Sequence, residues 1–352
     1  MSMKLRLLGV AAAAAMMLSA LPAMAGGELH IYNWGDYTNP KLIEKFQKET
    51  GIKVTLDSYD SNETMLAKVR AGGTGYDIVV PSDYTVKIMV EQGMLAETHP
   101  NQMANFKNVK PQFVNIYWDP GRNYTVPWQF GTTAFMVDTS KFKGNIDTYA
   151  LMFDPPADLK GRINMLDDEM SVIHAAERYL GVPRCNADKA TLKKISEMLL
   201  NAKQSWRTIS YDSRIMMTAG DVDLAETWNG EAHRTRLEVA KTPNTTRTIQ
   251  YAYPKEGIEG WMDNVAVLKD APNMDNAKAF QNFVMDPENA ALISEFAGYG
   301  NGIAGSEKYL PEEFANAPEI KAPAGSPTPE FVPPCPPEVV SMYNAIWTNL
   351  RK

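Results

Sequence analysis

Apolar and polar positions along residues 26–93 follow three successive units of a strand and a helix. The predicted strands are 28–33, 52–56 and 77–80, and the last is rich in β-branched residues, which is typical of a central strand. The predicted helices cover 40–50, 61–71 and 84–92. Asn39 as a cap, Pro40 at the first position and Gly51 as the stop define the first helix. This order predicts an α/β fold with a parallel or mixed sheet flanked by helices.

The later part of the chain contains clear helical patterns at 189–200, 276–285 and 337–350, and a short strand pattern at 224–228. Nine prolines between 311 and 337 indicate an extended, irregular segment. In the stretch GWMDNVAVL, residues 264–268 predict a buried strand, with Trp261 and Asp263 at its beginning. Side chains two positions apart share one face of a strand, so an indole and a carboxylate are predicted to lie together.

Aromatic and polar residues recur at one edge of the predicted sheet. In open α/β sheets, ligands bind beyond the carboxyl ends of the strands. The residues directly after the first and third strands are Trp34, Asp36, Tyr37, Ser82, Asp83 and Tyr84. This repetition predicts a binding site at that edge.

The first 25 residues have the pattern of a secretory signal peptide. Lys4 and Arg6 precede an apolar run, 7–21, and Ala23-Met24-Ala25 forms a small-x-small cleavage signal. The run is too short to span a bilayer comfortably, and no later stretch reaches the ~20 apolar residues that a span needs. We therefore expect an exported, soluble mature protein of about 326 residues, enough for two lobes.

Charge and cysteine content narrow the choice of partners. The full chain has a net charge of −7, which becomes −9 without the two basic residues of the signal. Because the protein is acidic, it is a poor partner for nucleic acid and a suitable partner for a cation, although a negative charge also favours solubility.

The two cysteines, Cys185 and Cys335, either form a disulfide or remain free thiols, and the sequence leaves both possibilities open.

Motifs typical of enzymes are weak. Residues 300–305 match G-x-G-x-x-G but lack a βαβ context, so they predict a glycine-rich turn. The four histidines are scattered and show no metal-ligand spacing. The acidic run 167–169 could act in acid–base chemistry or bind calcium, but no nucleophile or metal can be placed beside it. No cofactor, metal or catalytic residue is predicted.

Five blocks of sequence together resemble the spermidine/putrescine-binding proteins of bacterial ABC importers. They are NWGDY (33–37), SYDSNETMLAKVRAG (58–72), YDIVVPSDY (76–84), TWNGE (227–231) and GWMDNVAV (260–267). The resemblance implies a two-lobed, type II-like periplasmic binding protein with a mixed sheet in each lobe. It would capture a polyamine of the putrescine or spermidine class between the lobes and deliver it to a membrane permease. It also implies a first lobe of 26–131 plus 261–303, and a second of 132–260 plus 304–352.

The resemblance also implies which residues hold the ligand. The predicted set is Trp34, Asp36, Tyr37, Ser82, Tyr84, Asp168, Trp228, Glu231, Trp261, Asp263 and Tyr299. In this family aromatic faces hold the methylenes and carboxylates hold the ammonium groups, and Trp261 with Asp263 supplies both elements. One departure concerns Ser171, because the family usually has a glutamate there. Glu231 is a candidate to replace that carboxylate.

Two alternatives remain. The missing glutamate leaves room for a receptor of another cationic metabolite, such as an opine-like or guanidino compound. A secreted hydrolase using Asp167, Asp168 and Glu231 is the other alternative. We take a monomer as the starting assumption.

Overall fold

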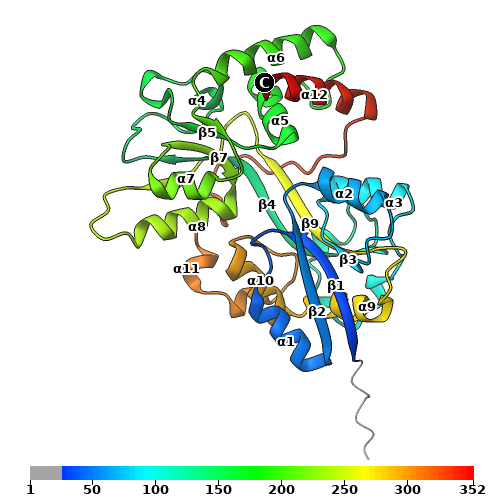
Figure 1. The fold of residues 1–352 in the computed structure, drawn as a ribbon. Helices are drawn as coiled ribbons and strands as arrows, with labels where there is room; N and C mark the ends of the chain where they lie inside the picture. The colour runs from blue at the N-terminus through cyan, green and yellow to red at the C-terminus, as the bar shows by residue number, and fades with distance from the viewer. Residues whose placement is uncertain (1–25) are drawn as a thin grey trace, which may run out of the picture.

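The computed structural model describes residues 26–352 and has two lobes (Figure 1). The predicted signal peptide, 1–25, lies outside the described residues. Within residues 26–352, no helix is long and apolar enough to cross a membrane. The mixed α/β, two-lobed architecture confirms the fold class expected from the sequence.

The strands and helices alternate along most of the chain. The strands are β1 (Gly27–Trp34), β2 (Ile52–Tyr59), β3 (Ile78–Val79), β4 (Thr125–Asp138), β5 (Ile163–Met165), β6 (Thr208–Ile209), β7 (Leu224–Trp228), β8 (Ile249–Tyr251) and β9 (Glu259–Val267). The helices are α1 (Pro40–Thr50), α2 (Asn62–Arg70), α3 (Asp83–Glu91), α4 (Ala150–Phe153), α5 (Glu169–Leu180), α6 (Lys189–Lys203), α7 (Ser213–Ala219), α8 (Asn229–Ala240), α9 (Met274–Val284), α10 (Pro287–Ala297), α11 (Glu312–Ala315) and α12 (Pro337–Leu350). Short 3₁₀ helices cover Pro100–Gln102, Ala104–Asn108, Pro111–Phe113, Ala157–Leu159 and Ser306–Tyr309.

Two long strands connect the lobes. The strands hydrogen-bond in the order β2-β1-β3-β9-β4-β7-β5-β6, with β8 also on β4. The β1–β2, β1–β3, β5–β6 and β5–β7 pairs are parallel, whereas β3–β9, β4–β9, β4–β7 and β4–β8 are antiparallel. β4 pairs with β9 along its first half and with β7 and β8 along its second. The antiparallel pair β4–β9 therefore runs from one lobe into the other (Figure 1).

Each lobe has its own hydrophobic core. One cluster of buried residues runs from Leu29 to Trp128 and returns from Met262 to Ile303. The other runs from Ala134 to Ile258 and returns from Cys335 to Leu350. We call the parts of the chain built around these clusters the first and second lobes. The residue at which each lobe begins and ends stays a prediction.

Local sequence signals define several helix ends well. Asn39 accepts a hydrogen bond from the Lys41 N–H, and Gly51 ends α1 with a left-handed backbone at φ 73°, a conformation that glycine adopts without steric cost. At α2, the Ser61 hydroxyl oxygen accepts from the Thr64 N–H. The caps of α1 are those expected from the sequence, because a side chain two or three residues away can satisfy a free backbone N–H without tertiary help.

The expected beginning of the strand after residue 260 was wrong. β9 begins at Glu259, so Trp261 and Asp263 lie inside the strand instead of at its start. The cause is the partner strand: β4 pairs Gly131 with Trp261 and Gln129 with Asp263. The ladder continues through residues that carry no strand pattern of their own.

The proline-rich segment runs back from the first lobe to the second. Apart from α11 it has little regular structure, as expected. It contacts the crossing strands, since the Gly260 N–H donates to the Glu330 carbonyl at 2.9 Å and the Glu330 N–H donates to the Ile258 carbonyl at 3.0 Å. α12 then packs on α5 and α6 (Figure 1).

Candidate functional site

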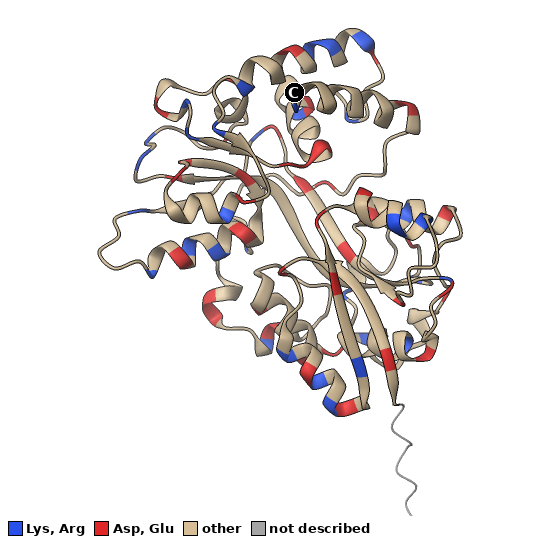
Figure 2. Ribbon diagram, viewed as in Figure 1, with Lys and Arg blue, Asp and Glu red and all other residues tan. Residues whose placement is uncertain are grey.

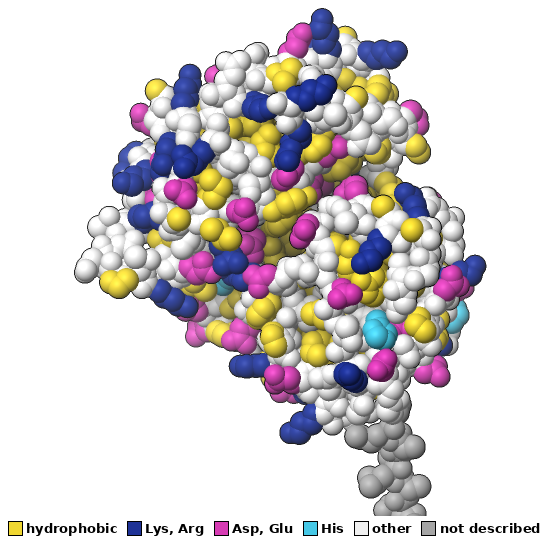
Figure 3. All heavy atoms as spheres, in the orientation of Figure 1, with side chains coloured by type: hydrophobic (Ala, Val, Ile, Leu, Met, Phe, Trp, Pro, Cys, Tyr) yellow, Lys and Arg dark blue, Asp and Glu magenta, His cyan; other side chains and the backbone are white. Residues whose placement is uncertain are grey.

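A cavity of about 370 Å³ lies between the lobes. Figure 3 shows the molecule hollowed there, with hydrophobic and acidic side chains gathered around the opening. All eleven binding residues expected from the sequence line this cavity. They come from both lobes: the end of β1 and the loop after it, the segment from the loop after β3 into α3, the residue before α5, the β7–α8 junction, β9, and the second residue after α10.

Asp263 is a buried carboxylate of the cavity, with 5 % of its surface exposed. The Ser82 hydroxyl donates to one carboxylate oxygen at 2.7 Å and the Tyr37 hydroxyl donates to the other at 2.8 Å. Burial raises the pKa of Asp263 to about 7, and these two hydrogen bonds oppose the rise. Both partners are neutral, so a cation that enters the cavity meets a carboxylate with no counter-ion.

Aromatic rings enclose the same space. The Trp261 and Tyr299 rings meet edge to face, with centroids 5.1 Å apart, and Tyr37 meets Tyr299 in the same way at 5.7 Å. The two glycines beside them permit this approach. A Cβ on Gly131 would lie 2.6 Å from Cζ2 of Trp261, and one on Gly230 would lie 2.4 Å from Cε1 of Tyr299. Any other residue at either position would push a ring out of place.

Further aromatic side chains line the cavity in both lobes. In the first lobe, the Trp34 indole N–H donates to the Val80 carbonyl at 2.9 Å. The centroids of the Trp34 and Tyr59 rings are 4.7 Å apart. In the second lobe, Trp228 stacks on Tyr211 at 6.3 Å, with 18° between the ring planes. Such faces attract cations and shield methylene groups from water.

The three carboxylates of the acidic run 167–169 lie in three different environments. The Asp168 carboxylate caps α5 by accepting from the Ser171 N–H at 2.9 Å, and burial together with the charge of Glu63 raises its pKa to about 6. Burial and the charge of Glu63 also raise the pKa of Glu169, to about 7. Asp167 instead pairs with Arg351 and does not line the cavity. Of the three, Asp168 is the one on the cavity surface.

Asp36 and Glu231 are paired with arginines. Arg214 and Arg234 each contact both carboxylates, at N–O distances of 2.6 to 3.1 Å. The sequence made Glu231 a candidate to replace the glutamate missing at Ser171. Both of its oxygens accept from guanidinium groups instead, so it offers no unpaired charge of the kind that Asp263 offers.

Charged residues outside the expected set of eleven also line the cavity: Asp60, Asp83, Arg184, Asp212, Arg214 and Glu259. Asp83 is 3 % exposed, and its Oδ2 has no hydrogen-bond partner among the described residues. Burial raises the pKa of Asp83 well above its usual range. Asp83 had been placed at the predicted binding edge but not in the set of eleven, and Glu259 directly precedes the block 260–267, so its position was a usable signal. Arg184 and Arg214 have no local signal and reach the cavity only through tertiary packing.

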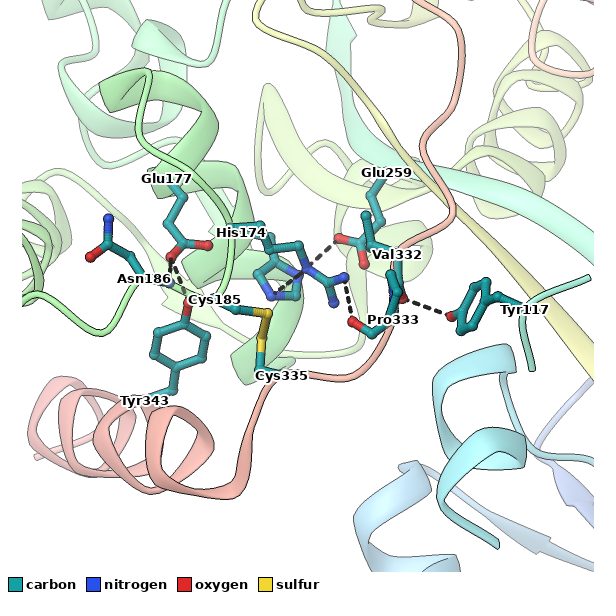
Figure 4. Close-up of a disulfide and its surroundings, with 11 residues drawn as sticks. Tyr117, His174, Glu177, Cys185, Asn186, Glu259, Val332, Pro333, Cys335 and Tyr343 are labelled. Carbon is teal, nitrogen blue, oxygen red and sulfur yellow. Dashed lines mark hydrogen bonds and ion pairs between the residues drawn. A yellow bond between two sulfur atoms is a disulfide. The ribbon is translucent and has the colours of Figure 1, made fainter. Parts of the chain in front are cut away.

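A disulfide supports one side of the cavity (Figure 4). Cys185 and Cys335 are bonded, which settles the question that the sequence left open. Their neighbours Arg184 and Val332 line the cavity. Arg184 donates to the His174 ring and to the Pro333 carbonyl. The Tyr117 hydroxyl of the first lobe donates to the Val332 carbonyl at 2.7 Å.

Comparison with known proteins agrees with this geometry. Residues 41–322 match the profile of the bacterial extracellular solute-binding proteins. The putrescine-binding periplasmic protein SpuD of Pseudomonas aeruginosa is 32% identical over 305 residues, 83% of each chain. The spermidine/putrescine-binding periplasmic protein of Escherichia coli is 34% identical over 309 residues, 87% of this chain and 86% of the relative.

A solved structure from Listeria monocytogenes, assigned as a spermidine/putrescine ABC transporter, superposes with a TM-score of 0.84 at 32% identity. The match covers 92% of this chain and 98% of that one. Proteins of this kind bind substrates for transport and are not enzymes, which agrees with the expectation from the sequence. The chain belongs to the family of bacterial extracellular solute-binding proteins.

Proposed function

We propose that this protein binds a polyamine of the putrescine or spermidine class in the cleft between its lobes. The bound polyamine passes to the membrane permease of an ABC importer. Relatives at 32–34% identity are named for binding putrescine or spermidine in the periplasm, and the expected signal peptide supports the same location. The two lobes that we propose, 26–131 with 261–303 and 132–260 with 304–352, close on the ligand.

The observation that carries this proposal is Asp263 inside its aromatic surroundings. A polyamine is a flexible apolar rod with a cation at each end. An indole face attracts a desolvated cation by up to ~2 kcal/mol, and a hydrogen bond to a charged group contributes roughly 1.5–3 kcal/mol. Asp263 has only neutral hydroxyl donors, and the Trp261 ring lies on the same strand.

We propose distinct roles for the residues of the site. Asp263 and Asp168 bind the ammonium groups, Ser82 and Tyr37 orient the Asp263 carboxylate, and the aromatic side chains enclose the methylenes. Those side chains are Trp34, Tyr84, Trp228, Trp261 and Tyr299. Asp36 and Glu231 belong to the site, but their charge is taken up by arginines.

A thermal-shift screen tests the proposed function. The mature protein is heated with putrescine, cadaverine, spermidine, spermine, agmatine and basic amino acids, each over a range of concentrations. A ligand present at 100 times its dissociation constant stabilises the folded state by about 2.7 kcal/mol, which is readily measured. We expect stabilisation by at least one di- or triamine, and no chemical change of the ligand.

The matched control is Asp263→Asn, which keeps the shape of the side chain and removes its charge. We expect the variant to lose most of the shift that amines produce. Failure of every amine to stabilise the wild type would overturn the proposed function. Stabilisation by an opine or a guanidino compound alone would favour the alternative ligand class.

A further inference from the structure

Two arginines and three acidic residues form an ionic cluster at the edge of the cleft. We call Asp36, Arg214, Glu231, Arg234 and Glu238 the arginine cluster. Arg214 on α7 donates through Nε to Glu231 at 2.9 Å, through Nη1 to Glu238 at 2.8 Å and through Nη2 to Asp36 at 3.1 Å. Arg234 on α8 donates to Glu231 at 3.0 Å and to Asp36 at 2.6 Å. Figure 2 shows both acidic and basic positions along α8, which carries Glu231, Arg234, Arg236 and Glu238.

The cluster adjoins the part of the cavity that contains Asp263. Asp36, Arg214 and Glu231 line the cavity directly. Gly230, the neighbour of Glu231, contacts the Tyr299 ring, and that ring meets both Trp261 and Tyr37. Tyr37 in turn donates to Asp263. One layer of aromatic rings therefore separates the arginine cluster from the buried carboxylate.

The two groups of carboxylates differ in the charge that they offer to a ligand. Asp263 accepts from neutral hydroxyls only, and the cap contact of Asp168 is a backbone N–H. At Glu231, each oxygen accepts from a guanidinium, and Oδ2 of Asp36 accepts from two. Side chains of both arginines are at least three-quarters buried, with 23 % and 19 % exposed, so solvent screens these charges only in part.

An ammonium group that approached Glu231 or Asp36 would meet two like charges. It would have to displace a guanidinium that is already paired, or remain unpaired beside it. Like charges placed together at a partly desolvated site oppose binding strongly. The same ammonium at Asp263 encounters no such competitor.

We propose that Arg214 and Arg234 are specificity residues that take the place of a ligand cation at Asp36 and Glu231. The cleft then accepts amines whose cationic groups reach Asp263 and the Asp168 side of the cavity. It discriminates against amines that place a further cation at the arginine cluster. This inference rests on the proposed function and adds to it the arrangement of charge on the preferred ligand.

The test is Arg214→Met, together with the double variant Arg214→Met/Arg234→Met. Calorimetry at fixed ionic strength measures the affinities of each protein for putrescine, spermidine and spermine. We expect the ratio of spermidine to putrescine affinity to rise by about tenfold or more in the double variant, because two carboxylates become available. Arg214→Met should show the same direction with a smaller change.

Two controls separate this effect from general electrostatics and from loosening of the cleft. Arg207→Met removes the same charge from an exposed side chain outside the cavity (Arg207 is 47 % exposed) and should leave the ratio unchanged. Adding both Asp36→Asn and Glu231→Gln to the double arginine variant should remove most of the gain. Circular dichroism checks that each variant is folded.

The outcomes are distinguishable. A folded double variant with the wild-type ratio overturns this inference and leaves polyamine binding intact. A wild type that binds no amine overturns the proposed function itself. A gain that survives the loss of both carboxylates shows that loss of packing, and not release of a carboxylate, caused it, and this also contradicts the inference.

Discussion

Folding of the ligand-free protein favours the protonated form of Asp263, whereas binding of a cation favours the ionised form. Its pKa in the folded, ligand-free protein is raised to about 7 by burial, whereas an aspartate in an unfolded chain titrates near 3.9. The folded state therefore binds this proton more tightly than the unfolded state does. The stability associated with the carboxyl group is complete below about pH 4 and is lost as the pH rises toward about 7.

Asp263→Asn should therefore stabilise the ligand-free protein at pH 8, by about 1–3 kcal/mol, because the amide cannot ionise. Near pH 4 the gain should disappear. The measurement is the difference in unfolding free energy between wild type and variant over pH 4–8, which cancels the other acidic groups. A difference that does not change with pH would mean that the carboxyl group does not titrate in this range.

The same substitution should weaken polyamine binding by roughly 2–5 kcal/mol, the range for breaking a buried charge pair. The change should appear mainly in the dissociation rate, since a buried contact holds the complex together. Wild-type affinity should increase as the pH rises through about 7, where the ligand no longer has to displace a proton. A variant altered only in association rate, with strong salt dependence, would assign Asp263 to steering instead.

Trp261 should contribute to binding without supporting the fold. Trp261→Ala removes a face for the cation and opens the cavity to water, so we expect a loss of about 2 kcal/mol or more in binding. Trp261→Phe keeps a ring and should lose less. Calorimetry of the two variants provides the measurement, and unchanged affinity in Trp261→Ala would remove this residue from the site.

At the scale of elements, the disulfide joins two segments that are 150 residues apart in the chain. It fixes the proline-rich segment beside the loop before α6, and so places Val332 and Arg184 at the cavity (Figure 4). Irregular chain with few backbone hydrogen bonds depends on such a link more than a helix does.

The free energy of unfolding of the double variant Cys185→Ser/Cys335→Ser should be lower than that of the wild type by about 2–5 kcal/mol. Chemical denaturation of the variant, and of the wild type with and without reductant, measures this. Reductant should lower the midpoint of the wild type and leave the variant unaffected. Equal midpoints for all samples would show that the crosslink contributes nothing to stability.

At the scale of the whole molecule, the contacts between the lobes include the β4–β9 pair, the Tyr117–Val332 hydrogen bond and the ion pairs from Asp36 to Arg214 and Arg234. Strands bend without breaking, whereas the other two contacts can separate. We expect the lobes to move as rigid bodies about the crossing strands.

Small-angle scattering should then give a smaller radius of gyration with saturating polyamine than without it. Asp263→Asn at the same ligand concentration is the control and should stay in the ligand-free form. Identical curves for the wild type in both states would argue against closure on the ligand.

Helix positions in this protein follow from short-range signals. Asn39, Ser61 and the glycine after α1 satisfy backbone groups a few residues away, and such caps act before any tertiary structure forms. The end of α12 and the strand 224–228 were also predictable, because the apolar positions of each segment fit a single type of secondary structure. The residues that line the cavity could be named in advance because aromatic and acidic side chains recur in blocks that resemble one family.

Tertiary structure alone decided which of these charges remain available to a ligand. Glu231 and Asp263 are both carboxylates in recognisable motifs, yet Glu231 is paired with Arg214 from another helix and Asp263 with two hydroxyls. The beginning of β9, the link between Cys185 and Cys335 and the position of Arg184 depend likewise on distant partners. Whether a carboxylate's charge is available to a ligand depends on the groups within a few ångströms of it. Those neighbours cannot be identified from the separation of residues along the chain.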